Sequence, residues 1–522
     1  MWTVIVNIMC ACFICHPPPL FHNHFALGHL IFANEALMRS HRRLRIIGRQ
    51  VSSLLCGFPC LRSTLINGFS EDSEYGQERD TCKSAIDILP DDALLEVFNF
   101  YLDGLYIRRY AWVPLAHVCR RWRYVVFASP RRLGLQVVFT GRRAIADILD
   151  VWPRFPILIT QHFLDSDKRI SRADNIVTAL DSVHHDRICE IYLGNISTSL
   201  WKRIASVMQK PFHELTRLYL QLNDGEGQVV VPLEGSAPHL QTLSLDYTPI
   251  PVVQKFLLSA NGLVILSLRN IPYSGYISPE AMASRSPPPL KRSVLPALTS
   301  FWYLGVHEYL EDVVARIDAP FLHHLDVDFF MCLTFDVPQL HRFISRAGEL
   351  RKFHEASVDF SLDRVAIKFS PKLTAVSYGY FSLLIRCEES SQQLLSIVQV
   401  CRSLSPPFAT SERLYLEVHI HRLSHLHWKD DMQSTQWLEL LYPFISVKNL
   451  YLADDIVLHV GHALQELAGG RVTEVLPALR TIFISGLESP GSVQKTMGRF
   501  VAARQLSGHP VAVNRWEEER EN

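Results

Sequence analysis

The chain lacks an excess of charge of either sign. Its 522 residues include 52 lysines and arginines and 52 aspartates and glutamates, so its formal net charge is zero. A protein whose main partner is nucleic acid normally shows a basic excess, because it must neutralise phosphates. The balance argues against nucleic-acid binding, although short basic clusters occur at residues 39–49 and 120–123.

Cysteines are few and follow no repeated spacing. There are 11, an odd number, which argues against a disulfide framework and favours a reducing compartment such as the cytoplasm or the nucleus. Cys12–His16 matches the Cys-x-x-Cys-His pattern of covalent haem attachment, but this short pattern is weak and no haem-sized fold surrounds it. We therefore expect no cofactor.

Histidines cluster without an evident metal set. Four of them fall at 419, 421, 425 and 427, and zinc could use such a group, but no cysteine lies near in sequence. Surface histidines in a loop between repeats are the better interpretation. The pairs His184–His185 and His323–His324 are interpreted in the same way.

Long hydrophobic runs are also missing. Trp2–Cys15 is apolar, but it is shorter than the roughly 20 residues that a membrane-spanning helix needs, and no positive segment precedes it as in a secretory signal. Pro17–Pro19 then end any helix. We expect residues 1–84 to be a poorly ordered leader and linker without membrane contact, and a weak signal-anchor is the alternative.

The motifs of several large enzyme classes are absent. The sequence contains no phosphate-binding loop of the G-x-x-x-x-G-K-[ST] type, no G-x-S-x-G nucleophile elbow and no H-E-x-x-H zinc motif. Cys119 could be proposed as a transfer nucleophile, but its place on a helix between Val118 and Arg120 favours a small buried hydrophobe. We expect no catalytic residues.

Two short helices are predicted between residues 86 and 126. Pro90 suits a first helical position and Asp91 and Asp92 suit a first turn. Large apolar residues then recur at helical spacing, and two helices of about forty residues are too small to stand alone. The apolar residues of the two helices are Leu94, Leu95, Val97, Phe98 and Tyr101, then Leu115, Val118, Trp122, Val125 and Val126.

The order of these residues resembles the F-box, the module that docks a substrate receptor onto the Skp adaptor of cullin-based ubiquitin ligases. The segment 103–113 between the helices is longer and more aromatic than a minimal F-box needs. An ordinary amphipathic helix pair inside a larger core is the alternative. The resemblance implies an adaptor-binding surface formed by Leu89, Pro90, Leu94, Val97, Phe98, Leu115, Val118, Cys119 and Trp122, with Phe98 and Trp122 as hot spots.

Beyond residue 130 the chain repeats a pattern of three apolar residues, spaced as apolar-x-x-apolar-x-apolar. The last two positions alternate as in a strand with one buried face. Weaker copies begin at Leu350 and end at Leu416. Clear copies begin at Ile188, Leu215, Leu240, Leu263, Leu298, Leu322, Leu373, Val447 and Leu479.

Helical patterns lie between these strands, at residues 176–183, 200–207, 313–317 and 394–400. The copies that begin at 188, 215, 240 and 263 lie 23 to 27 residues apart. Strands alternating with helices at a period in the twenties resemble the leucine-rich repeat, in which each unit buries its face by stacking on the next. The repeats are irregular, because the Asn that follows the strand in this family is clear only at Asn223. Unrelated strands in a plain α/β domain are the alternative.

These patterns predict an α/β chain with a helical F-box at 85–129, held rigidly against a leucine-rich-repeat-like solenoid at 130–510, and a charged tail at 511–522. The resemblance implies a substrate-recognition subunit of an Skp–cullin–F-box ubiquitin ligase, whose repeats bind an unidentified target protein. An interaction scaffold without ubiquitin transfer is the alternative, and a membrane-anchored variant comes third. The expected target-facing residues are Arg217, Tyr219, Gln241, Ser244, His323 and Asp326.

Overall fold

The chain divides into two compact units, Met1–Leu135 and Gln136–Asn522. The structure, a computed structural model, describes residues 89–516 and omits some segments between them. Several predictions fall outside the described residues. They concern the leader, the Cys12–His16 motif, the strand at 373–378, the histidines at 419–427 and the end of the tail. The omitted segments are 104–107, 131, 143, 150–154, 163–168, 183, 224–236, 248–252, 254–256, 258–259, 271–291, 331–336, 352, 372–380, 388–389, 405–407, 419–433, 468–470 and 486–489.

The described part of the first unit, from residue 89 on, contains three helices where the sequence predicted two. They are α5 (Asp91–Asp103), α6 (Arg108–Val118) and α7 (Arg120–Ala128). Helix α6 begins inside the segment that was expected to be an insert between helices. Its Pro114 lies in the helix interior, where proline normally breaks a helix, so the sequence alone gave no reason to extend a helix through this position.

The three helices have a core of their own. Leu94, Phe98, Leu115 and Trp122 are all buried, and the rings of Phe98 and Trp122 pack edge to face with centroids 4.7 Å apart. Trp112 adds a second edge contact with Phe127 at 6.1 Å. The large apolar side chains of this segment therefore pack largely against one another.

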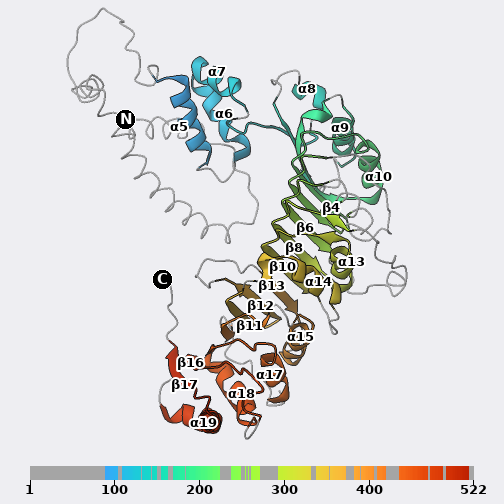
Figure 1. The fold of residues 1–522 in the computed structure, drawn as a ribbon. Coiled ribbons are helices and arrows are strands. Elements are labelled where there is room, and N and C mark those ends of the chain that lie inside the picture. The colour runs from blue at the N-terminus through green and yellow to red at the C-terminus, as the bar shows by residue number, and fades with distance from the viewer. Residues whose placement is uncertain are drawn as a thin grey trace, which may run out of the picture. The chain divides into compact units, whose positions relative to one another are not determined.

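In the second unit, one long sheet carries the fold (Figure 1). Its fifteen strands follow the order β1-β2-β3-β4-β5-β6-β8-β10-β13-β12-β11-β14-β15-β16-β17, and β7 pairs with β9 in a small separate sheet. The strands are β1 Val137–Phe139, β2 Ile157–His162, β3 Ile188–Ile196, β4 Arg217–Leu222, β5 Thr242–Asp246, β6 Ile265–Asn270, β7 Ser293–Val294, β8 Ser300–Gly305, β9 Ile317–Asp318, β10 His324–Phe330, β11 Glu355–Phe360, β12 Arg364–Ser370, β13 Phe381–Arg386, β14 Arg413–Val418, β15 Asn449–Leu452, β16 Thr481–Ser485 and β17 Ala512–Trp516.

Helices cover one face of this sheet, on the right of the ribbon in Figure 1 from α9 to α15. The helical patterns at 176–183, 200–207, 313–317 and 394–400 correspond to four of them, although Ile317 belongs to β9 instead. Two short 3₁₀ turns lie at His185–Arg187 and Glu349–Arg351. The helices are α8 Ile145–Leu149, α9 Arg169–Asp181, α10 Thr198–Val207, α13 His307–Val314, α14 Pro338–Arg346, α15 Ser390–Ser403, α17 Ser434–Leu441, α18 Asp454–Gln465 and α19 Pro490–Leu506.

The predicted apolar positions face the helices in register. Leu218, Leu243, Leu266, Phe301 and Leu325 pair in turn along neighbouring parallel strands, and each is buried. Burial of such a side chain contributes roughly 1.5–3 kcal/mol relative to its exposed state. The repeat therefore builds a continuous core between sheet and helices, as expected of a leucine-rich-repeat-like solenoid.

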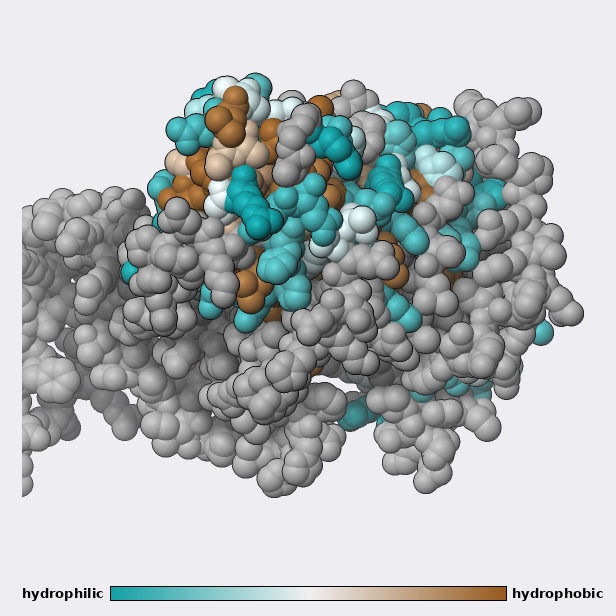
Figure 2. All heavy atoms as spheres, turned by 90° about the horizontal axis from the view of Figure 1, so that it is seen from below, coloured by the Kyte–Doolittle hydropathy of each residue, from teal (hydrophilic) through white to brown (hydrophobic). Residues whose placement is uncertain are grey.

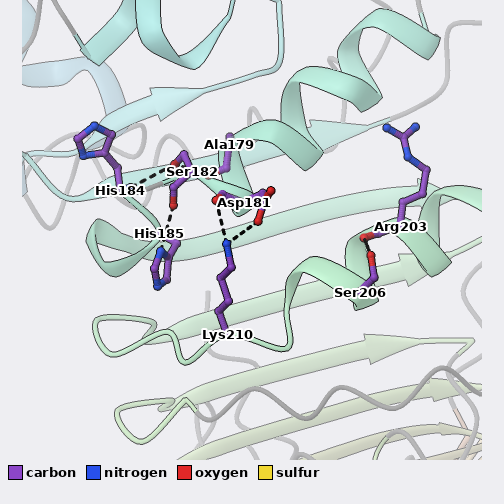
Figure 3. Close-up of polar contacts among 8 residues, drawn as sticks. All are labelled: Ala179, Asp181, Ser182, His184, His185, Arg203, Ser206 and Lys210. Carbon is purple, nitrogen blue, oxygen red and sulfur yellow. Dashed lines mark hydrogen bonds and ion pairs between the residues drawn. The ribbon is translucent and has the colours of Figure 1, made fainter.

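Neighbouring helices are also tied to one another on the surface. Lys210, just after α10, bonds Asp181 at the end of α9 at 2.5 Å. The turn after α9 is closed by Ser182, whose hydroxyl donates to the Ala179 carbonyl at 2.8 Å and accepts the amide of His184 at 3.3 Å (Figure 3). The Lys210–Asp181 pair links two neighbouring repeats, and the Ser182 contacts order the turn that follows α9.

Among the described strands, an antiparallel strand interrupts the parallel array at one place. β13 pairs parallel with β10 and β11 pairs parallel with β14, but β12 between them runs antiparallel to both neighbours. The chain thus passes over two strand positions, turns back at Ser361–Asp363 and fills them in reverse order. Gln393 of α15 holds that turn, donating to the carbonyl of Ser361 at 2.8 Å. The sequence predicted a solenoid of repeated units, and the observed sheet differs from it by this three-strand reversal.

Candidate functional site

The two ends of the predicted docking motif lie side by side. Arg121, in the first turn of α7, donates a hydrogen bond to the carbonyl of Leu89 and forms an ion pair with Asp91 at 2.7 Å. Arg123 also ties α7 to α6 by donating to the carbonyl of Ala116 at 2.9 Å. The start of α5 is thereby fixed next to the junction of α6 and α7.

An apolar edge is exposed at this meeting point. Val118 is 46% exposed, Pro90 is exposed, and Leu89 and Cys119 are half-buried. We call these four residues the junction edge. Val97 is half-buried further along α5, so five of the nine predicted adaptor-binding residues reach the surface and the other four form the core.

Cys119 has a structural role at this edge. It is half-buried rather than buried, which corrects the expectation for this residue. Its sulfur accepts the amide of Trp122 at 3.4 Å and so caps the first turn of α7. A side-chain acceptor at this position satisfies a backbone N–H that has no partner within the helix.

Charged pairs flank the helices of the first unit. Arg132 bonds Glu96 at 2.5 Å and Asp92 at 3.2 Å, on the outer side of α5. All three side chains are well exposed, so these contacts contribute little stability. They do mark that side of α5 as polar, whereas the junction edge is apolar.

The second candidate surface is the face of the long sheet that points away from the helices, which we call the open face. Arg217, Tyr219, Ser244 and Asp326 belong to it, as the sequence predicted, because they alternate with buried neighbours. Gln241 and His323 precede their strands. The ring Nδ1 of His323 donates a hydrogen bond to the Phe321 carbonyl at 2.9 Å.

Ion pairs on the open face cross from strand to strand around the reversal. Asp328 of β10 pairs with Arg386 of β13 at 2.7 Å, and Lys368 of β12 pairs with Asp359 of β11 at 2.5 Å. Arg413 of β14 pairs with Glu355 of β11 at 2.8 Å. The charges of these six side chains are therefore compensated within the chain.

Aromatic rings gather on the open face at its C-terminal end. Tyr415, Tyr451 and Phe483 occupy one register row on β14, β15 and β16. The first two stack at 4.3 Å and the last two at 4.6 Å. Trp516 of β17 contacts Tyr415 and Tyr451 at 5.9 and 5.5 Å. We call the three stacked rings the aromatic ladder.

Sequence reasoning missed the aromatic ladder although a signal for it exists. Tyr415, Tyr451 and Phe483 each stand between the last two apolar residues of a repeat, which is the one position of the pattern that must point away from the helices. Nothing comparable marks Trp516, because the strand that carries it does not follow the repeat pattern.

A buried carboxylate lies at the N-terminal part of the open face. Asp246 is 2% exposed and accepts a hydrogen bond from the hydroxyl of Tyr219 at 3.0 Å. Burial raises the pKa of Asp246, although the nearby charge of Arg269 and this hydrogen bond act to lower it. Burial, with the charge of Asp246, raises the pKa of Tyr219 to about 12.

Neither unit shows a metal centre in its described parts. Within the described ranges, no group of three or more His, Cys, Asp or Glu residues is placed to hold a metal ion. The His184–His185 pair belongs to the turn after α9, where the His185 ring bonds the carbonyl of Ser182 at 3.0 Å (Figure 3). Over the same ranges, no helix is long and apolar enough to cross a membrane.

Seen from below, the coloured surface mixes hydrophobic and hydrophilic side chains instead of forming one uniform area (Figure 2). Several large apolar side chains of the last repeats are exposed, among them Tyr442, Ile445, Leu458 and Leu506. Single exposed apolar residues are ordinary on protein surfaces, so they define no further site.

Comparison with known proteins adds a distant structural likeness. No family model matches the chain, and no curated protein matches it. Among solved structures, the chain is similar to the leucine-rich repeat-containing protein LegL7 from Legionella pneumophila, at 12% identity and a TM-score of 0.23. The match covers 72% of this chain and 98% of that protein. A likeness at this TM-score says nothing about function. The F-box and the ubiquitin-ligase role therefore remain predictions.

Proposed function

We propose that the chain is a non-catalytic substrate-recognition subunit of an Skp–cullin–F-box type ubiquitin ligase. In this proposal the helices of the first unit dock onto the Skp adaptor, and through it onto the cullin, while the open face of the sheet binds a target protein. By holding both, the chain raises the effective concentration of the target near a charged ubiquitin carrier. The proposal places the chain in the cytoplasm or the nucleus.

One observation supports the docking role most directly. Arg121 brings the two ends of the F-box-like motif together through Leu89 and Asp91. The apolar residues left at that meeting point are exposed or half-buried. Small apolar patches at the centre of an interface are where binding energy concentrates. The junction edge is therefore the expected contact with the adaptor.

The test is co-purification with the Skp adaptor and a cullin. We expect Val118→Glu to abolish capture of the adaptor, because a charge would be buried without a partner in the interface, while the thermal unfolding of the chain stays unchanged. Tyr124→Glu is the matched control, since Tyr124 is 70% exposed on α7 outside the junction edge. Equal capture by both variants would contradict the docking role.

The alternative function is an interaction scaffold without ubiquitin transfer. In this alternative, too, the open face binds a partner protein. The exposed aromatic and polar strand positions of that face support both functions equally well. The same purification separates the two functions: an adaptor complex that never recruits the cullin favours the scaffold.

A further inference from the structure

Helix α7 begins with cations at the end of the helix that disfavours them. Arg120 and Arg121 occupy its first turn, which contains no acidic residue, and Arg123 follows close behind. The aligned peptide dipoles make a helix N-terminus partly positive, so cations there destabilise the helix. Carboxylates are the expected residues at this place, as Asp91 and Asp92 are in α5. The stability of α7 therefore does not explain these arginines.

An ion pair within the chain accounts for one of the three. Arg121 pairs with Asp91 at 2.7 Å. Arg123 donates its Nε–H to the Ala116 carbonyl at 2.9 Å, a contact that leaves its charge without a carboxylate, and Arg120 is exposed. Within the described part of the chain, neither Arg120 nor Arg123 forms an ion pair. Two cations of α7 are thus uncompensated there.

Both of these cations border the junction edge. Arg120 follows Cys119 directly in the chain. The bond between Arg123 and Ala116 holds the arginine side chain against the last turn of α6, which ends at Val118. The exposed apolar residues of the edge therefore have positive charge next to them.

The outer side of α5 has no such excess. Its Asp92 and Glu96 are both bonded by Arg132, so the charges there are of mixed sign and paired. Among the side chains that the structure describes in the first unit, the unpaired positive charge is found beside the junction edge. A partner with negative charge around an apolar centre would complement this arrangement.

We propose that the junction edge docks onto an acidic surface of the Skp adaptor, and that Arg120 and Arg123 accelerate this encounter. Opposite charges around an interface raise the association rate more than the final affinity, whereas apolar contacts at its centre slow dissociation. Phosphate-bearing ligands fit less well, because two cations neutralise few phosphates and an apolar centre adds nothing to such binding. This acidic contact rests on the proposed docking role, to which it adds the charge of the partner surface.

The test measures association and dissociation rates of the full chain on the immobilised Skp adaptor, by biolayer interferometry at several salt concentrations. For the native chain the association rate should fall as salt rises, because salt screens exposed charges. Arg120→Glu should slow association about fivefold at low salt and leave the dissociation rate nearly unchanged. A glutamate suits the first turn of a helix, so this variant should fold at least as well as the native chain.

Arg132→Glu is the matched control, because it changes the net charge by the same amount on the outer side of α5 and should alter the association rate far less. Val118→Ala should instead raise the dissociation rate and keep the salt dependence.

Equal slowing by Arg120→Glu and Arg132→Glu, or an association rate that is independent of salt, would overturn the acidic contact and leave adaptor binding standing. Displacement of the adaptor by a short duplex DNA would assign the two cations to phosphate and overturn it too. A native chain that does not bind the adaptor would overturn the proposed docking role together with the acidic contact.

Discussion

At the scale of single residues, burial separates two roles that the sequence could not distinguish. Leu94, Phe98, Leu115 and Trp122 carry the F-box-like pattern as strongly as Pro90 and Val118 do, but they form the core of the three helices. The sequence reveals which positions are apolar, whereas the third helix decides which of them remain exposed. A substitution at Trp122 therefore tests stability, and a substitution at Val118 tests binding.

Trp122→Ala should strongly destabilise the first unit. Trp122 is 6% exposed and contacts Phe98, and removal of a buried tryptophan costs about 3–5 kcal/mol of the free energy of unfolding. Denaturant unfolding with hydrogen exchange in α5–α7 measures the effect. Tyr124→Ala, at a 70% exposed position of the same helix, should change little. Comparable losses in both variants would show that Trp122 is not part of a core.

Asp246 should make stability depend on pH. Since burial raises its pKa in the folded chain, the folded state holds the proton more tightly than the unfolded state does. The free energy of unfolding therefore falls as pH rises from the ordinary carboxyl value, about 3.9, to the raised value. At neutral pH the buried charge remains a cost to the folded state.

Asp246→Asn removes this cost and can still accept the hydrogen bond from Tyr219. We expect the melting temperature of the variant to exceed that of the native chain at neutral pH, with a smaller difference near pH 4, an acidity close to the ordinary carboxyl value. Asp363→Asn is the control, because that side chain is 70% exposed. A difference that grows on acidification would contradict the expected sign.

At the scale of elements, the alternation of apolar residues predicted where strands occur better than it predicted which strands pair. The apolar residues at 218, 243, 266, 301 and 325 are buried in register as the repeat pattern indicated. The reversal of β11, β12 and β13 was not predicted, because alternation fixes which face of a strand is buried but not the direction in which the strand runs. Val365, Ile367 and Phe369 of β12 show the same alternation as a parallel strand would.

Phe369→Ala should loosen this reversal selectively. The Phe369 ring stacks on Phe408 at 4.5 Å and on Phe381 at 5.6 Å, so it joins β12 to its neighbours in the core. The expected loss is about 3–5 kcal/mol, with faster hydrogen exchange in β11, β12 and β13 than in β3–β6. Leu362→Ala in the exposed turn should leave exchange unchanged. Uniform acceleration throughout the sheet would argue against a separate role for the reversal.

At the scale of the whole molecule, the chain combines two compact units with different surfaces. The first offers a small apolar edge at Pro90 and Val118, and the second offers a long open face with compensated ion pairs and an aromatic end. The fold class and the polarity of the open face follow from the sequence, since periodicity fixes both. For the aromatic ladder, the repeat pattern places Tyr415, Tyr451 and Phe483 away from the helices, but it does not show that their strands are neighbours in register.

We propose that this chain connects a ligase core to a target protein. Light scattering of the purified full chain, mixed with the Skp adaptor and a cullin, is the sharpest test of this connecting role. We expect a ternary complex whose mass is the sum of one copy of each protein, with 59.7 kDa contributed by this chain. The proposed role is wrong if the chain elutes alone at its own mass while adaptor and cullin form their complex without it.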